Sequence, residues 1–297
     1  MSAARWTSAA RLAAAVVARR DLAEAVRVLN AAGIIPMPLK GVLLQQEVYR
    51  DPGARVLSDV DLLVRPGRFG DALAALRHAD YRLDAEGRTG RSARGPDASL
   101  EVDLHRRLFS PGLFRLHARH LFARGRLDTE GFGATVILPA PLDVYAHLVG
   151  NFAKGRHTDA HAFQVRDLAA VAARYRLGPA ATAAHLRAHG LGRAARYALP
   201  FAAADGDAFA PRVLTALGPD PIGDGAALLA RSLATRCGSS ARASLLAPHL
   251  VNHTLAAGAW SCSVHLVLGA RRSLLGRPDD RGRGADPEPS SRAPGVR

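Results

Sequence analysis

Two aspartates separated by one residue lie in an otherwise apolar stretch of the chain. Asp59 and Asp61 belong to "RVLSDVDLLV", residues 55–64, whose branched apolar residues predict a strand over 59–64. Residues two apart on a strand point to the same face, so the two carboxylates would project side by side, about 5–7 Å apart. Such a pair repels itself unless a cation lies between, and Mg²⁺ binds one or two carboxylates together with substrate phosphates. The pair alone fits a metal site, but it favours an edge strand whose solvated aspartates pair with nearby arginines.

Two other stretches carry groups that would complete a metal and phosphate site. "EVDLH" places Glu101, Asp103 and His105 on one face of a second strand. "PLKG" places Lys40 and Gly41 at a strand-to-helix turn, where helix amides can receive a phosphate and a lysine can contact it. Together the three stretches describe a phosphate cradle, a carboxylate pair for a metal and a third carboxylate.

These motifs also resemble those of a known family. "PLKG", "YRDPGARVLSDVDLLV" and "EVDLHRRL" occur in the order and spacing of the uncharacterised nucleotidyltransferase-like proteins, within the DNA-polymerase-β-type nucleotidyltransferase superfamily. The resemblance covers residues 30–110 well, and it extends weakly through "NFAKGRH" and "RDLAAV" into the second half. It implies an α+β fold, in which a polymerase-β-type domain with a small mixed sheet and flanking helices is followed by a helical domain.

The resemblance assigns roles to the residues of the three motifs. Asp59 and Asp61 match the metal-binding pair, and Asp103 is the expected third catalytic carboxylate. In such enzymes one Mg²⁺ (or Mn²⁺) holds the triphosphate of the NTP, and another lowers the pKa of the attacking hydroxyl. Lys40 and Gly41 occupy the place where the superfamily usually has a glycine-serine pair, so this chain departs from the pattern at the phosphates.

Further nucleotide contacts are expected outside these motifs. Arg55 and Ser58 precede the metal strand and are candidates for phosphate contacts, although Arg55 equally fits a structural partner of Asp61. The superfamily's helical second domains imply that Lys154 and Asp167 approach the nucleotide across a cleft. Asp167 also fits an ordinary ion pair within a helix.

Several histidines and cysteines carry weaker signals. His105 either orients a carboxylate, contacts the substrate, or is simply a hydrogen-bonded strand residue. Asn151 stands where the family is expected to carry a histidine. His157 and His161 share a helix face, but with no glutamate after the first histidine and no third ligand we expect an exposed pair. Phosphate-loop, dinucleotide and serine-hydrolase motifs are absent from the sequence, and the two cysteines are interpreted as core residues of a cytoplasmic protein.

Charge gives a second, less specific indication. The 297 residues carry a net charge of +14, and 38 of the 40 basic residues are arginines. The arginines are scattered and aromatic residues are only 5%, so nucleic-acid binding stays an open alternative without a motif to carry it. The only lysines, Lys40 and Lys154, both fall in the stretches considered above, which suggests places that need a compact charge.

The pattern of elements divides the chain into three parts. Residues 1–138 are predicted to form the nucleotidyltransferase-like α/β domain with an N-terminal helix, residues 139–275 a helical domain, and residues 276–297 a disordered tail. Residues 255–270 are apolar but short and contain a histidine, so we expect a buried helix and no membrane partner. The stretch 87–98 is expected to be a loop.

The function predicted from these features is an Mg²⁺-dependent nucleotidyltransferase. It would move a nucleoside monophosphate from an NTP to a hydroxyl or phosphate of an acceptor, which is open among protein, peptide, RNA and small molecule. The alternative is a non-catalytic nucleotide-binding or antitoxin-like interaction module with the same fold.

Overall fold

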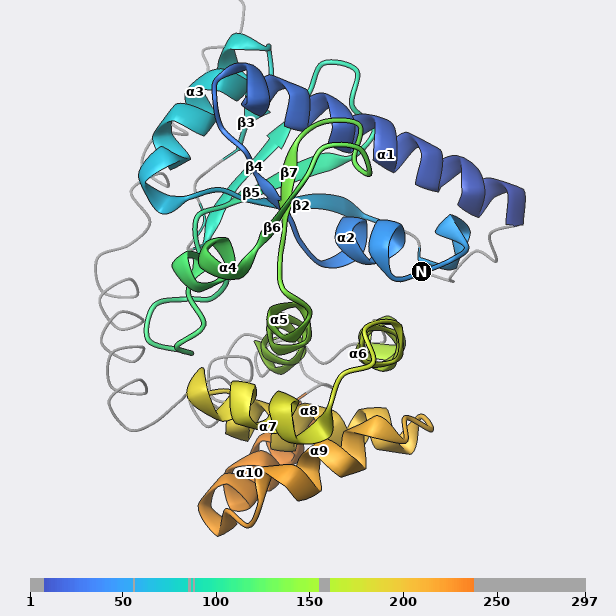
Figure 1. Cartoon of the computed structure of the whole chain (residues 1–297), viewed down its shortest axis with the longest axis vertical. Helices are drawn as coiled ribbons and strands as arrows, with labels where there is room; N and C mark the ends of the chain where they lie inside the picture. Colours follow the sequence, from blue (N-terminus) through green and yellow to red (C-terminus); the bar gives the residue numbers. More distant parts are fainter. Residues whose placement is uncertain (1–7, 56, 85–86, 88, 155–160, 238–297) are drawn as a thin grey trace, which may run out of the picture.

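The computed structural model describes residues 8–55, 57–84, 87, 89–154 and 161–237 of the chain (Figure 1). The expectations for the pair His157 and His161, for the two cysteine side chains, for residues 255–270 and for the tail 276–297 fall outside this description. Within it, no helix combines the length and the hydropathy needed to cross a membrane.

A five-stranded mixed sheet forms the first half of the molecule. Its strands lie in the order β1 (Met37–Pro38), β2 (Asp59–Leu63), β5 (Glu101–His105), β4 (Gly90–Arg94) and β3 (Arg82–Leu83). Strands β2 and β5 are parallel, and the other neighbours in the sheet are antiparallel. The strand alternation divides β2 cleanly, because Val60 and Leu62 are fully buried on one face while the aspartates occupy the other.

Helices cover this sheet on both sides. Helices α1 (Ser8–Ala31) and α3 (Phe69–His78) lie together above it in Figure 1, and α1 contacts β2. Helix α2 (Lys40–Glu47) packs on β2, and a hairpin of β6 (Arg126–Asp128) and β7 (Val136–Leu138) lies against β1. The short elements are η1 (Pro52–Ala54), η2 (Pro66–Arg68) and α4 (Ala118–Arg124).

The second half of the described chain is entirely helical. Its helices are α5 (Pro141–Lys154), α6 (His161–Arg174), α7 (Pro179–Ala188), α8 (Gly192–Ala204), α9 (Phe209–Leu217) and α10 (Pro221–Cys237). Figure 1 shows α5 and α6 nearest the sheet and α7 to α10 beyond them. Buried apolar side chains form one cluster that runs from Leu22 to Ala230 through both halves. The α+β fold class with a helical second part is confirmed, and the boundary at 138 stays a prediction.

One expectation about the sheet is wrong. Residues 87–98 were expected to form a loop, but Gly90–Arg94 is strand β4, paired with both β5 and β3. The segment "GRSAR" has no branched apolar residue, so its sequence carries no strand pattern. Its pairing depends on Gly90, where an added Cβ would lie 2.0 Å from the carbonyl oxygen of Leu104.

Candidate active site

Strands β2 and β5 bring the acidic motifs together. Because the two strands are parallel and in register, Asp61 lies directly opposite Asp103, and Asp59 lies opposite Glu101. Ligand atoms of Asp61, Asp103 and His105 all lie within 4.8 Å of one another. Two motifs 42 residues apart in the sequence therefore form a single group of oxygen and nitrogen donors on one face of the sheet.

Asp61 is the most constrained member of this group. Its side chain is 3% exposed, and its Oδ1 accepts hydrogen bonds from Lys40 Nζ at 2.5 Å and from His105 Nε2 at 2.8 Å. Burial would raise the pKa of this carboxyl, but the hydrogen bond from His105 and the charge of Lys40 hold it well below its usual range. Asp61 is therefore an ionised carboxylate held in one position.

Asp59 has a different environment from Asp61. It is half-buried, and its Oδ1 accepts a hydrogen bond from the exposed Ser58 at 3.0 Å. Burial and the negative charge of Asp61 raise its pKa, and the charge of Lys40 opposes this shift. Asp59 is not among the three residues whose donor atoms lie within 4.8 Å of one another. It therefore interacts with Asp61 through charge and not as part of that close group.

Asp103 is positioned by a residue that no pattern in the sequence indicated. Ser92, on β4, donates a hydrogen bond from its hydroxyl to Asp103 Oδ1 at 2.5 Å. The pairing of β4 with β5 places Ser92 directly opposite Asp103. Ser92 lies in the segment taken for a loop, so no periodicity in the sequence pointed to it.

Lys40 and Gly41 begin helix α2 beside these carboxylates. Lys40 has a φ of 46°, in the left-handed region that is uncommon outside glycine. An added Cβ on Gly41 would lie 2.6 Å from the end of the Leu57 side chain, which would have to shift to accept a larger residue. The amide of Leu39 donates to the carbonyl oxygen of Asp61 at 3.0 Å, which ties this helix start to β2. The backbone geometry directs the ammonium of Lys40 to Asp61.

Helix α5 contributes a second lysine. Burial lowers the pKa of Lys154 to about 8, the charge of Lys40 adds to this shift, and Asp61 and Asp103 oppose it. His147, two turns earlier on the same helix, is buried among these charges, and burial together with Lys40 holds its pKa well below the usual range. The charges of both lysines thus interact with Asp61. His147 was not predicted, although it lies seven residues before Lys154, a spacing that places two residues on the same face of a helix.

Arg55 and Asp167 form an ion pair with each other. Arg55 Nε donates to Asp167 Oδ2 at 3.2 Å, and Tyr49 donates its hydroxyl proton to Asp167 Oδ1 at 2.7 Å. Asp167 is 2% exposed, and its pKa is raised by burial against the opposing charge of Arg55. This contact with Asp167 links the segment before β2 to helix α6, and a phosphate contact of Arg55 stays a prediction.

The donors at this site suit a divalent cation. Asp61 and Asp103 offer carboxylate oxygens, the ligands that Mg²⁺ and Mn²⁺ prefer, and His105 adds a nitrogen of the kind that Mn²⁺ accepts, while Asp59 lies outside this group. The two neighbouring ammonium groups suit the negative charge of phosphates. The arrangement can therefore hold a metal together with a phosphate chain.

Several known proteins are similar to parts of this chain. A family model described as uncharacterised nucleotidyltransferase matches residues 2–204. A search of curated proteins found no match. Among solved structures, the antibiotic-resistance factor ANT(2'')-Ia in solution is 13% identical, with a TM-score of 0.42 over 53% of this chain and 83% of its own.

Two crystal structures give similar values. ANT(2'')-Ia in complex with adenylyl-2''-tobramycin is 14% identical, with a TM-score of 0.43 over 55% of this chain and 91% of its own. An antigenic nucleotidyltransferase-like protein from Paracoccidioides brasiliensis is 14% identical, with a TM-score of 0.37 over 52% of this chain and 74% of its own. The family match spans more than half of the 297 residues, and this chain belongs to the uncharacterised nucleotidyltransferase family, as its three motifs predicted.

Proposed function

We propose that the protein transfers a nucleoside monophosphate from an NTP to a hydroxyl or phosphate group of an acceptor. In this reaction an acceptor oxygen forms a bond to the α-phosphorus, and the bond from that phosphorus to the pyrophosphate oxygen breaks. The observation that carries the proposal is the convergence of Asp61 and Asp103 from adjacent parallel strands with Lys40 and Lys154. Phosphoryl transfer depends mainly on positioning and on charge neutralisation, and this group of residues supplies both.

Each residue has a distinct part in this proposal. Asp59, Asp61 and Asp103 would hold a divalent ion such as Mg²⁺ or Mn²⁺, which when bound neutralises phosphate charge and lowers the pKa of an attacking hydroxyl. His105 keeps Asp61 in place through its hydrogen bond at 2.8 Å. Asp103, fixed by Ser92, is the carboxylate that would accept the proton of the acceptor hydroxyl.

The lysines are the residues proposed to hold the phosphates. Lys40 pairs with Asp61 at 2.5 Å, and its side chain is 21% exposed. A triphosphate that takes this ammonium as its partner frees Asp61 Oδ1 for a cation. Lys154 approaches from helix α5, so a nucleotide between the two lysines would be held by both halves of the molecule.

One observation favours a second candidate, a non-catalytic nucleotide-binding or interaction module. The Lys40 ammonium already neutralises Asp61, and Asp59 is turned towards Ser58, so the carboxylates are satisfied without a metal. A protein of this kind would bind an NTP and leave it intact.

Labelled nucleotides separate the two candidates. The protein is incubated with each NTP carrying label on either the α- or the γ-phosphate, with Mg²⁺ or Mn²⁺, alone and with cell extract. The enzyme transfers the α label to an acceptor and releases the γ label as pyrophosphate. An Asp59→Ala/Asp61→Ala variant serves as the control and is expected to transfer no label. Nucleotide binding without transfer, or transfer that persists in the double variant, would overturn the proposal.

A further inference from the structure

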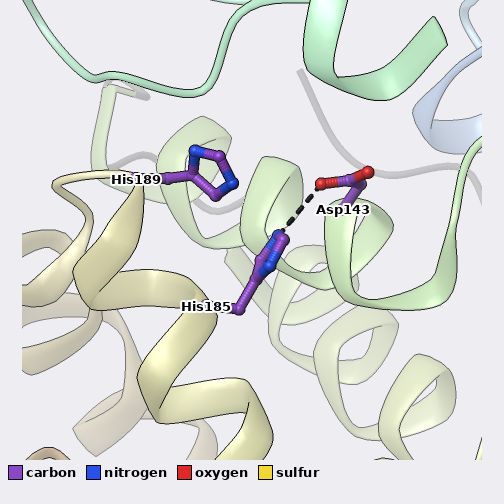
Figure 2. Close-up of side chains that lie close together, drawn as sticks. All are labelled: Asp143, His185 and His189. Carbon is purple, nitrogen blue, oxygen red and sulfur yellow. Dashed lines mark hydrogen bonds and ion pairs between the residues drawn. The ribbon is translucent and has the colours of Figure 1, made fainter. Parts of the chain in front are cut away.

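A second group of metal-ligating side chains lies away from the nucleotide site, where α4, α5 and α7 meet. Asp143 belongs to the first turn of α5, His185 to the last turn of α7, and His189 is the C-cap of α7. Their ligand atoms all lie within 4.8 Å of one another. Figure 2 shows the two imidazoles and the carboxylate pointing toward a common space.

The chemistry of these donors differs from that of the carboxylate site. Two imidazole nitrogens and one carboxylate oxygen are ligands typical of Zn²⁺ and other divalent transition metals, whereas Mg²⁺ prefers oxygen alone. Ligand atoms around a tetrahedral Zn²⁺ at 2.0–2.1 Å lie about 3.4 Å apart, which small side-chain rotations reach from the observed spacing. His185 and His189 are four residues apart, the spacing that puts two side chains on one helix face.

A cation already occupies this space. Arg124, the last residue of α4, donates from Nε and Nη2 to the two oxygens of Asp143, at 2.9 and 2.6 Å. Its Nη2 also lies 3.4 Å from His189 Nε2. Arginine has no acceptor, so this nitrogen of His189 presents its lone pair to the cluster, as a metal ligand must.

Arg124 is the more accessible partner of this ion pair. Asp143 is completely buried, whereas the Arg124 side chain is 39% exposed. Arg124 also lines a hollow of about 140 Å³, which Glu47 borders as well. His185 Nε2 donates to Asp143 Oδ1 at 2.9 Å, and a move of that proton to Nδ1 turns Nε2 into a ligand.

We infer that Asp143, His185 and His189 form a binding site for a divalent transition-metal ion, and that Arg124 holds the place of the metal and competes with it. Zinc is the probe of choice. The bound ion would join α5 to the C-terminal end of α7 directly. The site is independent of the proposed nucleotidyl transfer.

Zinc titration of tag-free, full-length protein by calorimetry tests this site. The titrations use an Asp61→Asn/Asp103→Asn background, so that the carboxylate site cannot contribute. We expect one Zn²⁺ per chain, and a Co²⁺ complex with visible absorption. His189→Ala and His185→Ala should each weaken zinc binding at least about tenfold, with His189→Gln as a milder second variant. His78→Ala, at an exposed position on α3, should bind as the background protein does.

Arg124→Gln distinguishes a metal site from a structural salt bridge. If Arg124 competes with the metal, its removal strengthens zinc binding, by about tenfold. Zinc binding that is unchanged in His189→Ala, weakened in Arg124→Gln, or lost only when His157 and His161 are replaced would overturn the inference. Circular dichroism of each variant establishes that the comparison is made between folded proteins.

Discussion

Asp61 shows how much of this site depends on single contacts. The same carboxylate oxygen accepts from Lys40 and from His105, and the surrounding protein excludes nearly all solvent. An ionised carboxylate that is buried needs such partners, because an unpaired charge would be costly in this environment. The contacts with Lys40 and His105 therefore keep Asp61 charged, as the proposed cation site requires.

Lys40 is a residue whose backbone and side chain can be tested separately. With φ at 46°, any residue with a Cβ is strained there by about 1 kcal/mol relative to glycine. In urea denaturation, we expect the free energy of unfolding of the Lys40→Gly variant to exceed that of the Lys40→Ala variant by about that amount. Both variants should bind NTP at least about tenfold more weakly, since both lack the charge. Equal stability of the two variants would contradict the strain, and unchanged binding would contradict the phosphate contact.

Lys154 should make nucleotide binding sensitive to pH. Its pKa of about 8 means that the side chain is charged below that pH and neutral above it. The dissociation constant for the Mg²⁺–NTP complex should be constant up to about pH 7.5 and then increase, approaching about tenfold per pH unit. Arginine stays charged throughout this range, so Lys154→Arg should give a flat profile by isothermal titration. A profile that is identical in the two proteins would exclude Lys154 as its source.

At the scale of elements, helix α5 packs closely against the segment that follows β5 at one glycine. An added Cβ at Gly150 would lie 2.4 Å from the ring of Phe109. The same ring faces the Lys154 ammonium, with 5.8 Å between Nζ and the ring centroid. We expect Gly150→Ala to lower the free energy of unfolding by about 1–3 kcal/mol and to raise KM for the NTP. Gly70→Ala on α3, where the Cβ meets nothing within 4 Å, should gain up to about 1 kcal/mol. Equal effects of the two substitutions would argue against the packing constraint.

The contact of Asp167 with Arg55 and Tyr49 fastens α6 to the segment before β2. Removing one partner of a buried ion pair leaves the other without compensation, so Asp167→Ala should lower the free energy of unfolding by about 3 kcal/mol. Asp71→Ala, which breaks an exposed pair with Arg68, should cost less than about 1 kcal/mol. Urea denaturation of both variants makes this comparison. A loss no larger than that of Asp71→Ala would contradict the buried link.

The elements that carry a clear pattern were predictable from the sequence. The strand expected over 59–64 is β2 at 59–63, and the alternation in "EVDLH" is β5, since branched apolar residues mark both. The register that sets Asp61 against Asp103 depends on a parallel crossover, which no local pattern records. Strand β4 and Ser92 were missed because long-range backbone pairing, not side-chain periodicity, makes that segment a strand.

At the scale of the whole molecule, the site lies between the sheet and the helical half. Asp59, Asp61 and Asp103 come from the sheet, whereas Lys154 and His147 come from α5, and one apolar cluster runs through both halves. The sheet residues were indicated by motif, whereas Lys154 was indicated by its rarity among 38 arginines and by the resemblance to the superfamily's helical second domains. Its position next to Lys40 follows from the packing of α5, which tertiary contacts decide.

The rate of α-label transfer by single-site variants tests the central claim most directly. Asp61→Asn and Asp103→Asn keep the size of each side chain and remove its charge, and Asp71→Asn is the matched control on an exposed helix face. With Mg²⁺ and saturating NTP, we expect each of the first two to lower the rate by about a hundredfold or more, and the control to match the unaltered protein. Transfer at the unaltered rate by folded Asp61→Asn or Asp103→Asn protein would contradict the claim that these carboxylates carry the reaction.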